Sequence, residues 1–412
     1  MKIISIFLMV TAAVIFLPAA ILGDIVINDR LTLDGNIRFR LEIEGKDFSN
    51  ETGMYDCTYL RTMLGFTCKA SEEVKLRIKF KESRYLGTSG SNKKSTSFFD
   101  LQEGYIQVQE LLGMPFDLQL GRYEMLYGRR RIIGNGIWNN FGPRTFDGFR
   151  TLYINETLEM DFFFAKVVER SFIDQQPYTG DDFSACDRNL FGVNLSLKKG
   201  NLQPLLVVDW DSRNDLQHSD LILMPAIYGK NNIIGCTLEF DAGYQWGKKN
   251  DADLNSWLLA ADLIYTFPNV PQPLLGLGFD ITSGTSEKDA AAGEDHTFYT
   301  PFMSRHRFKG FMDYYTDVYK GLFDLIVHFG VSPDDKTNLQ LDVHNFQTLE
   351  PLLNSTGEKY HQMGQEADLR LRASLAKGLD LDTAVCAYLA SQDWQPSGDP
   401  GYFYYLTLTA KF

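Results

Sequence analysis

The chain alternates apolar and polar residues over most of its length, and this alternation limits the folds that it can adopt. In VKLRIKFKES (74–83), four apolar residues alternate with four cations, and NIRFRLEIEG (36–45) and DLRLRASLA (368–376) repeat the pattern. Successive side chains of an extended strand point to opposite faces, so a period of two predicts strands. Each strand then has one apolar and one charged face, and the fold must place these faces in different surroundings.

Turn and loop signals separate the alternating segments. TSGSNKKSTS (88–97), SGTSEKDAAAGEDH (283–296) and SPDDK (332–336) are rich in the small and polar residues typical of connections. About sixteen to eighteen strands of roughly ten residues fit between such stretches, and a strand of that length spans a bilayer when tilted. No change of composition marks a domain boundary, so we predict that residues 24–412 form one domain.

The first 23 residues predict export. One positive charge at Lys2 precedes an apolar run to Leu17, and Pro18 and small residues follow. This is the pattern of a secretory signal peptide cleaved near Ala20 or Gly23; an uncleaved membrane anchor is the alternative. No stretch of 18 apolar residues follows, so the sequence predicts no further transmembrane helix.

Two architectures can bury one face of this many strands. A soluble sandwich or propeller packs the apolar face on another sheet, whereas an outer-membrane barrel turns it to lipid and lines its lumen with the polar face. The dense charge on the second face suits a water-filled lumen, and the aromatic segments DYYTDVY (313–319) and FFDLQEGY (98–105) suit interfacial girdles. The last segment, YFYYLTLTAKF (402–412), resembles the terminal strand of bacterial outer-membrane barrels. We therefore predict an all-β fold, a transmembrane antiparallel up-and-down β-barrel.

Residues 121–150, GRYEMLYGRRRIIGNGIWNNFGPRTFDGFR, resemble the signature of the alginate export family of outer-membrane barrels. The shared features are a Gly-Arg start, a Trp-centred loop and an Arg-Thr-Phe-Asp-Gly tail, and segments 59–84, 305–317 and 369–390 are similar as well. The resemblance implies an 18-stranded barrel in the bacterial outer membrane, with a basic, constricted lumen that passes an anionic polysaccharide outward and with periplasmic export partners. The run Arg129–Arg131 departs from the family pattern, so the resemblance does not establish alginate as the substrate.

If the apolar faces meet lipid, the charged faces line the lumen. The basic candidates are Arg38, Arg40, Arg61, Lys75, Arg77, Lys79, Lys81, Arg307, Lys309, Arg370 and Arg372. The acidic candidates are Glu42, Glu44, Asp313, Asp342, Asp380 and Asp382, and the other acids are expected to cluster in connections. Rings of Arg and Lys favour anions, and guanidinium groups bind carboxylates such as those of a uronate chain in bidentate geometry. Alternatively, these charges pair across strands and stiffen the wall without selecting a solute.

A second set of arginines lies in the signature segment: Arg122, Arg129, Arg131, Arg144 and Arg150. We predict that they converge near one inward-folding loop and form a constriction; a salt-bridge cluster with Glu124 and Asp147 that closes the loop is the alternative. Asp147 and Glu124 are expected to orient the arginines rather than to touch solute. Trp138 and Asn140 are candidates for contact with sugar rings, and a role as an interfacial anchor is the alternative for Trp138.

Charge and motif content narrow the function. A net charge of −13 argues against a nucleic-acid partner. The five Cys and six His show no metal-binding spacing, so neither a metal nor a cofactor is predicted. No GxSxG or comparable nucleophile motif occurs, so we expect no enzyme activity, with an outer-membrane hydrolase as the alternative. The sequence thus predicts a porin-like, anion-passing channel surrounded by outer-membrane lipid, which exports an alginate-like polysaccharide or, alternatively, serves as a non-selective general porin.

Overall fold

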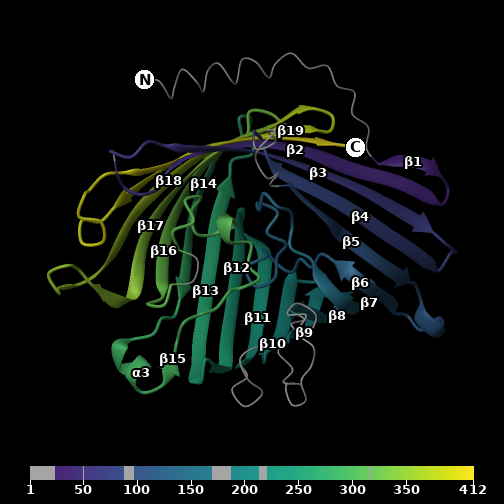
Figure 1. The fold of residues 1–412 in the computed structure, drawn as a ribbon, viewed down its shortest axis with the longest axis horizontal. Coiled ribbons are helices and arrows are strands. Elements are labelled where there is room, and N and C mark those ends of the chain that lie inside the picture. The colour runs from purple at the N-terminus through teal and green to yellow at the C-terminus, as the bar shows by residue number, and fades with distance from the viewer. Residues whose placement is uncertain (1–23, 50, 88–96, 169–186, 213–219, 316–317) are drawn as a thin grey trace.

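The computed structural model describes residues 24–49, 51–87, 97–168, 187–212, 220–315 and 318–412, so the predicted signal peptide at residues 1–23 lies outside the described residues. Eighteen antiparallel strands in these ranges follow one another around a barrel (Figure 1). They are β2 (Leu31–Gly45), β3 (Tyr55–Lys69), β4 (Val74–Tyr85), β5 (Ser97–Val108), β6 (Asp117–Tyr123), β7 (Phe146–Ile154), β8 (Leu158–Val168), β9 (Arg188–Leu197), β10 (Leu202–Asp211), β11 (Asp220–Ile233), β12 (Cys236–Lys249), β13 (Ala252–Thr266), β14 (Leu274–Thr282), β16 (Leu322–Val331), β17 (Thr337–Leu353), β18 (Lys359–Ala376), β19 (Leu379–Ala390) and β20 (Gly401–Lys411).

The barrel closes between its first and last long strands. β2 pairs with β20 from Asn36↔Lys411 to Gly45↔Tyr402, and the purple and yellow ends of the chain lie side by side in Figure 1. Two short strands add to the sheet: β1 (Ile25–Asn28) folds back on β2, and β15 (Glu294–Asp295) pairs in parallel with the start of β13. Closure pairs the backbone groups that a free sheet edge would leave unsatisfied in lipid. The prediction of an 18-stranded antiparallel barrel is confirmed.

Short helical segments occur only in connections within the described ranges. They are η2 (Leu111–Gly113), α3 (Glu287–Ala291) and η3 (Arg305–Arg307). No helix in this part of the chain is long and apolar enough to cross a membrane.

The two ends of the barrel differ in the length of their connections. Short turns such as 155–157, 234–235 and 377–378 join strands at one end, and long connections such as 124–145 and 283–321 lie at the other. Outer-membrane barrels have short periplasmic turns and longer extracellular loops. We therefore take the end with the long connections as the extracellular end.

The alternation in β4 separates its two faces as the sequence predicted. Leu76 and Ile78 are 36% and 45% exposed on the outer face, where the barrel meets lipid. Arg77 and Lys79 lie on the inner face, beside carboxylates of β5 and β2. Apolar side chains outside and charged side chains inside are the arrangement of a transmembrane barrel.

One aromatic segment lies elsewhere than expected. Tyr314 and Tyr315, from the predicted girdle segment 313–319, follow η3 in a connection and belong to an apolar cluster inside the barrel. The Tyr315 ring lies 4.5 Å from that of Phe346 and 6.1 Å from that of Tyr388, centroid to centroid. The girdle prediction was wrong here because the segment is a folded-in loop and not the end of a strand.

Candidate functional site: two loops inside the barrel

Two long connections fold into the barrel interior (Figure 1). The first inward loop comprises residues 124–145, between β6 and β7, and the second comprises the described residues 296–315 and 318–321, between β15 and β16. The first loop contacts β2 and β3 at one end and β12, β13 and β14 at the other. Because these two groups of strands lie on different sides of the barrel, the loop crosses the interior and narrows it.

Wall arginines hold the first inward loop on the β2–β3 side. The Arg38 guanidinium donates hydrogen bonds to the carbonyl oxygens of Ile137 and Asn139 and to Oδ1 of Asn140, each at 3.0 Å. Arg61 donates to the same Asn139 carbonyl at 2.9 Å. Arg38 and Arg61 are only 6% and 4% exposed. Both point inward, but their donors bind loop backbone instead of facing open lumen.

Arg40 binds the centre of the loop by two kinds of contact. Its guanidinium carbon lies 3.3 Å from the centroid of the Trp138 ring, and its Nη1 donates to the Trp138 carbonyl at 2.9 Å. Its Nε lies 2.7 Å from Oε1 of Glu42, which also accepts a hydrogen bond from Asn140 at 3.2 Å. With Arg40 1% exposed, this is a desolvated cation–π contact, worth about 2 kcal/mol. Trp138 is therefore packed in the interior and is not an anchor at the membrane interface.

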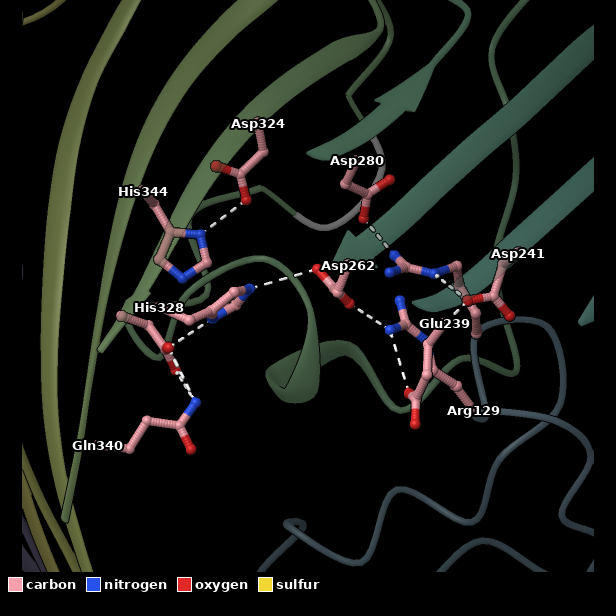
Figure 2. A network of polar contacts seen from close by, with 11 residues as sticks. Arg129, Glu239, Asp241, Asp262, Asp280, Asp324, His328, Gln340 and His344 are labelled. Atoms are coloured by element: carbon pink, nitrogen blue, oxygen red, sulfur yellow. Dashed lines mark hydrogen bonds and ion pairs between the residues drawn. The ribbon is translucent and has the colours of Figure 1, made fainter. Parts of the chain in front are cut away.

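Arg129 attaches the same loop to the opposite wall (Figure 2). Its Nε donates to Asp241 Oδ2 at 2.9 Å, and its Nη1 lies 3.3 Å from Glu239 Oε2. It also pairs with Asp262. Although burial disfavours its charged form, this ring of carboxylates keeps the pKa of Arg129 above its ordinary value.

Arg131 makes the most deeply buried ion pair of this network. Its Nε shares Asp241 Oδ2 with Arg129, at 3.2 Å, and it pairs with Asp280 as well. The side chains of Arg131 and Asp280 are 3% and 1% exposed. Removing one partner of such a pair leaves an uncompensated buried charge and costs about 3–5 kcal/mol. The charges of loop and wall are thus matched to each other.

The carboxylates that receive these arginines belong to an acidic wall, of which the sequence analysis placed only Asp342 in the lumen. We use this name for the inward-facing acids of β12–β18: Glu239, Asp241, Asp262, Asp280, Asp324, Asp342, Glu366 and Asp368. Asp342 was predicted to face the lumen, but the other acids of this set were expected in connections, and that expectation was wrong for them. Single acids within apolar strand segments, such as Asp280 in GLGFDIT, were the available signal.

Histidines extend the network along the acidic wall. His328 contacts Asp342 through Nδ1 at 2.7 Å and Asp262 through Nε2 at 3.3 Å. His344 contacts Asp324 through Nδ1 at 2.7 Å. These imidazoles place further hydrogen-bonding groups between carboxylates that face one another across strands (Figure 2).

Apolar side chains seat the middle of the first inward loop. Met125, Tyr127 and Ile133 are at most 7% exposed and belong to one cluster with Phe163 of β8 and Val207 of β10. Burying each such side chain contributes about 1.5–3 kcal/mol. The inner face of β8–β10 is therefore partly apolar because a loop, and not water, covers it.

The second inward loop packs on the first. The Trp138 and His306 rings stack with centroids 3.5 Å apart, and the Gly134 amide donates to the Phe302 carbonyl at 2.8 Å. The loop also binds the wall, because the amides of Phe311 and Met312 donate to carboxylates of the acidic wall at 3.2 and 2.8 Å. Arg307 and Lys309 lie in this loop and not on a strand as predicted.

Cations on β4 face the part of the interior nearest the first loop. Arg77 pairs with Asp34 and donates from Nε to Glu103 at 3.0 Å. The Lys79 ammonium lies 3.9 Å from a carboxylate oxygen of each of these two acids. Lys81 lies 3.5 Å from Asp100, and Lys75 forms no ion pair with any described residue. These four cations form what we call the β4 strip.

The remaining predicted charges pair locally. Arg370 forms a bidentate pair with Asp382 at 2.8 and 2.5 Å, and Arg372 donates to Asn338 at 2.8 Å. Asp380 pairs with Lys411 at 2.7 Å. Glu44, Asp313 and Asp342 pair at 3.2, 2.8 and 2.7 Å with Lys46, His306 and His328.

The five arginines of the signature segment do not converge. Arg122 alternates with Tyr123, which is 1% exposed in the interior cluster, so Arg122 lies on the outer face. It forms a bidentate pair with its register partner Asp147 at 2.7 and 2.8 Å. Asp147 thus orients one arginine, but that arginine is outside the lumen.

Arg144 and Arg150 are inside but separate from Arg129 and Arg131. Arg144 donates to the Gly134 carbonyl at 2.9 Å and so braces the first inward loop against itself. Arg150 lies on β7, where it donates to Gln119 at 2.8 Å. Glu124 accepts hydrogen bonds from Asn135 at 2.7 Å and Gln102 at 3.3 Å, and no described arginine pairs with it.

Comparison with protein families identifies the chain. The model of the alginate export family matches residues 29–390, which is most of the sequence. The chain belongs to the alginate export family. No curated protein matches it significantly.

Solved structures show the same fold in other bacterial outer-membrane proteins. OccK9 (OpdG) of Pseudomonas aeruginosa is similar with a TM-score of 0.62 at 11% identity, over 93% of this chain and 98% of that one. OccAB4 of Acinetobacter baumannii gives 0.61 at 11%, over 96% and 100%, and the outer membrane protein OprD of Pseudomonas aeruginosa gives 0.60 at 11%, over 96% and 97%. Together with the family, these folds make the chain a β-barrel channel of the outer membrane.

In this member of the alginate export family, the signature segment contains the end of β6, the first inward loop and the start of β7. Gly128 has a φ of 53°, and a Cβ there would lie 2.9 Å from the Cβ of Tyr228. Arg131 and Trp138 bind opposite walls. The signature therefore encodes a loop that is attached to two opposite sides of the barrel.

Proposed function

We propose that this channel passes anionic solutes and that the β4 strip guides them. The supporting observation is the placement of Lys75, Arg77, Lys79 and Lys81 at alternate positions on the inner face of one strand. At about 3.4 Å per residue, the strip extends over about 20 Å along the strand. That is roughly two thirds of the hydrocarbon thickness of a bilayer.

The β4 strip has more positive than negative charge around it. Among the described residues, Arg77, Lys79 and Lys81 share three carboxylates within 4.0 Å, those of Asp34, Asp100 and Glu103, and Lys75 has none. The 3.9 Å separations of Lys79 are too long for hydrogen bonds, so its donors are available to a solute. Low-dielectric walls focus the field of such cations on the pore and raise the local anion concentration.

More specifically, we propose that the anionic solute is an alginate-like polysaccharide. A uronate chain carries a carboxylate on every sugar, so successive carboxylates would meet successive cations of the strip. Membership in the alginate export family supports this solute class and supports the participation of periplasmic export partners. We further propose that the protein is a channel without enzyme activity; hydrolysis of ester or peptide probes by the purified protein would argue against this.

A general porin without charge selectivity is the second candidate. The acidic wall favours it, because carboxylates on the opposite side of the interior would offset the β4 strip. Arg129 and Arg131 neutralise part of that wall, which supports the anionic alternative. The charge selectivity of the channel therefore depends on the cations of the β4 strip that have no carboxylate within hydrogen-bond distance among the described residues, Lys75 and Lys79.

Reversal potentials in planar bilayers under a salt gradient test the proposal. We expect the native channel to prefer anions and Lys79→Glu to move the reversal potential toward cation preference. Arg84→Glu is the matched control: Arg84 is on the same strand but on its outer face, 2.6 Å from Glu82, and should leave selectivity unchanged. Cation preference in the native protein, or an equal effect of the two substitutions, would reject the proposal.

A further inference from the structure

A histidine and two carboxylates converge near the extracellular rim, away from the constriction. His296, Asp289 and Glu294 lie on the connection between β14 and β16, on or next to α3 and β15. One ligand atom from each lies within 4.8 Å of the other two. We propose that these three side chains bind a divalent transition-metal ion, for which Zn²⁺ is the best match.

The histidine is oriented for this role. Its Nδ1 lies 2.5 Å from the backbone carbonyl oxygen of Asn255, which can only accept a hydrogen bond, so Nδ1 carries the proton. Nε2 then faces Glu294 Oε2 at 3.4 Å. A carbonyl on the far nitrogen is the usual partner of a metal-binding histidine, because it fixes the tautomer and the ring orientation. In neutral His296, the Nε2 lone pair faces carboxylate oxygen, an arrangement that a cation between them would stabilise.

The segments that contribute the ligands are held in place. Ser286 caps α3 and donates from Oγ to Asp289 Oδ2 at 2.6 Å, which leaves Oδ1 for a metal. Asp295, between the other two ligands and 8% exposed, accepts hydrogen bonds from Thr285 at 2.8 Å and Tyr299 at 2.5 Å. β15 also pairs with β13. The three ligand side chains are therefore positioned by α3, β15 and the hydrogen bonds around them.

The donor set and the space beside it favour zinc over calcium. Imidazole nitrogen suits Zn²⁺, Cu²⁺ and Ni²⁺, whereas Ca²⁺ takes six to eight oxygen ligands. Tetrahedral Zn²⁺ with bonds of about 2.0–2.2 Å holds its ligand atoms about 3.5 Å apart, so the side chains need to close by about 1 Å. His296 and Asp289 line an open pocket of about 290 Å³, together with Trp257 and Glu350, which leaves room for a fourth ligand such as water.

Zinc titration of the full-length protein in detergent micelles tests the proposal. Calorimetry, with metal analysis after buffer exchange, should give one Zn²⁺ per chain, and His296→Ala should weaken binding by more than about tenfold. His361→Ala is the matched control. His361 is exposed and its Nδ1 also lies near a carbonyl oxygen, that of Thr348 at 2.8 Å, but no metal-binding group among the described residues includes it.

Each outcome decides the assignment. Retained binding in His361→Ala, with loss in both His296→Ala and Asp289→Asn, supports the site. Heat-modifiable migration in gels should show a folded barrel for every variant. No zinc bound by the native protein, equal binding by His296→Ala, or equal loss in the His361→Ala control would each overturn the proposal. Calcium binding that His296→Ala leaves unchanged would also contradict it, because the imidazole would then have no part.

Discussion

Replacing Arg131 by Met should release the first inward loop from the acidic wall. The substitution keeps the size and flexibility of the side chain but removes the charge that Asp280 and Asp241 face. With Arg131 and Asp280 3% and 1% exposed, water cannot replace the lost partner without rearrangement. The expected cost is about 3–5 kcal/mol. Since each 1.4 kcal/mol is a factor of ten, the equilibrium between attached and released loop should shift by more than about 100-fold.

Single-channel recording measures this release. Arg131→Met should raise the mean conductance and its fluctuations, because the loop no longer crosses the lumen in one position. Arg130→Met is the control, since Arg130 is adjacent but forms no ion pair with the described residues. Adding Asp280→Asn to Arg131→Met should restore part of the thermal stability, because no unpaired charge then remains at that position, but the conductance should stay high.

Two results would refute the reasoning on Arg131. One is a conductance of Arg131→Met equal to that of Arg130→Met. The other is a thermal midpoint that the two variants share. The buried ion pair of Arg131 would then contribute no more than Arg130, a half-buried cation with no ion pair among the described residues. Because the pair is buried, its contribution should also depend little on ionic strength.

Two further predictions concern the contact between the inward loops. Burial lowers the pKa of His306 below its ordinary value of 6.5, although Asp313 opposes this, with Arg40 and Asp368 also near. The neutral imidazole therefore stabilises the contact between the loops above about pH 6.5, and this contribution is lost as the pH falls toward the lowered pKa. The conductance should rise on acidification, and His306→Gln should remove this rise. Trp138→Ala should lower the free energy that holds the first inward loop in place by about 3–5 kcal/mol and raise the conductance, whereas Trp138→Phe should retain much of the stacking. Equal conductance of these two variants would contradict this prediction.

Local alternation made the barrel and the faces of its strands predictable. In β4, Leu76 and Arg77 point to opposite sides because consecutive residues of any strand do so, whatever lies beyond them. The same rule placed Arg38 and Arg40 inside. It was less informative in β8 and β10, where both faces include apolar residues because the first inward loop covers the inner one.

The partners of the inward side chains could not be read in the same way. Arg131 meets Asp280 across 149 residues of sequence, and Arg38 meets carbonyl groups about 100 residues away. Loop backbone has no period that predicts its path, so the sequence did not show which groups Arg131 and Arg38 would bind. Arg122 lies outside because strand β6 extends to Tyr123, which places it on the opposite face from the expected one.

By itself, then, the sequence determined the closed sheet, its apolar exterior and its charged interior, because these depend on geometry repeated at every second residue. Only the tertiary structure decided which interior charges are neutralised and which are open to a solute. That choice depends on two loops that cross the interior, and their positions follow from contacts between residues far apart in the chain.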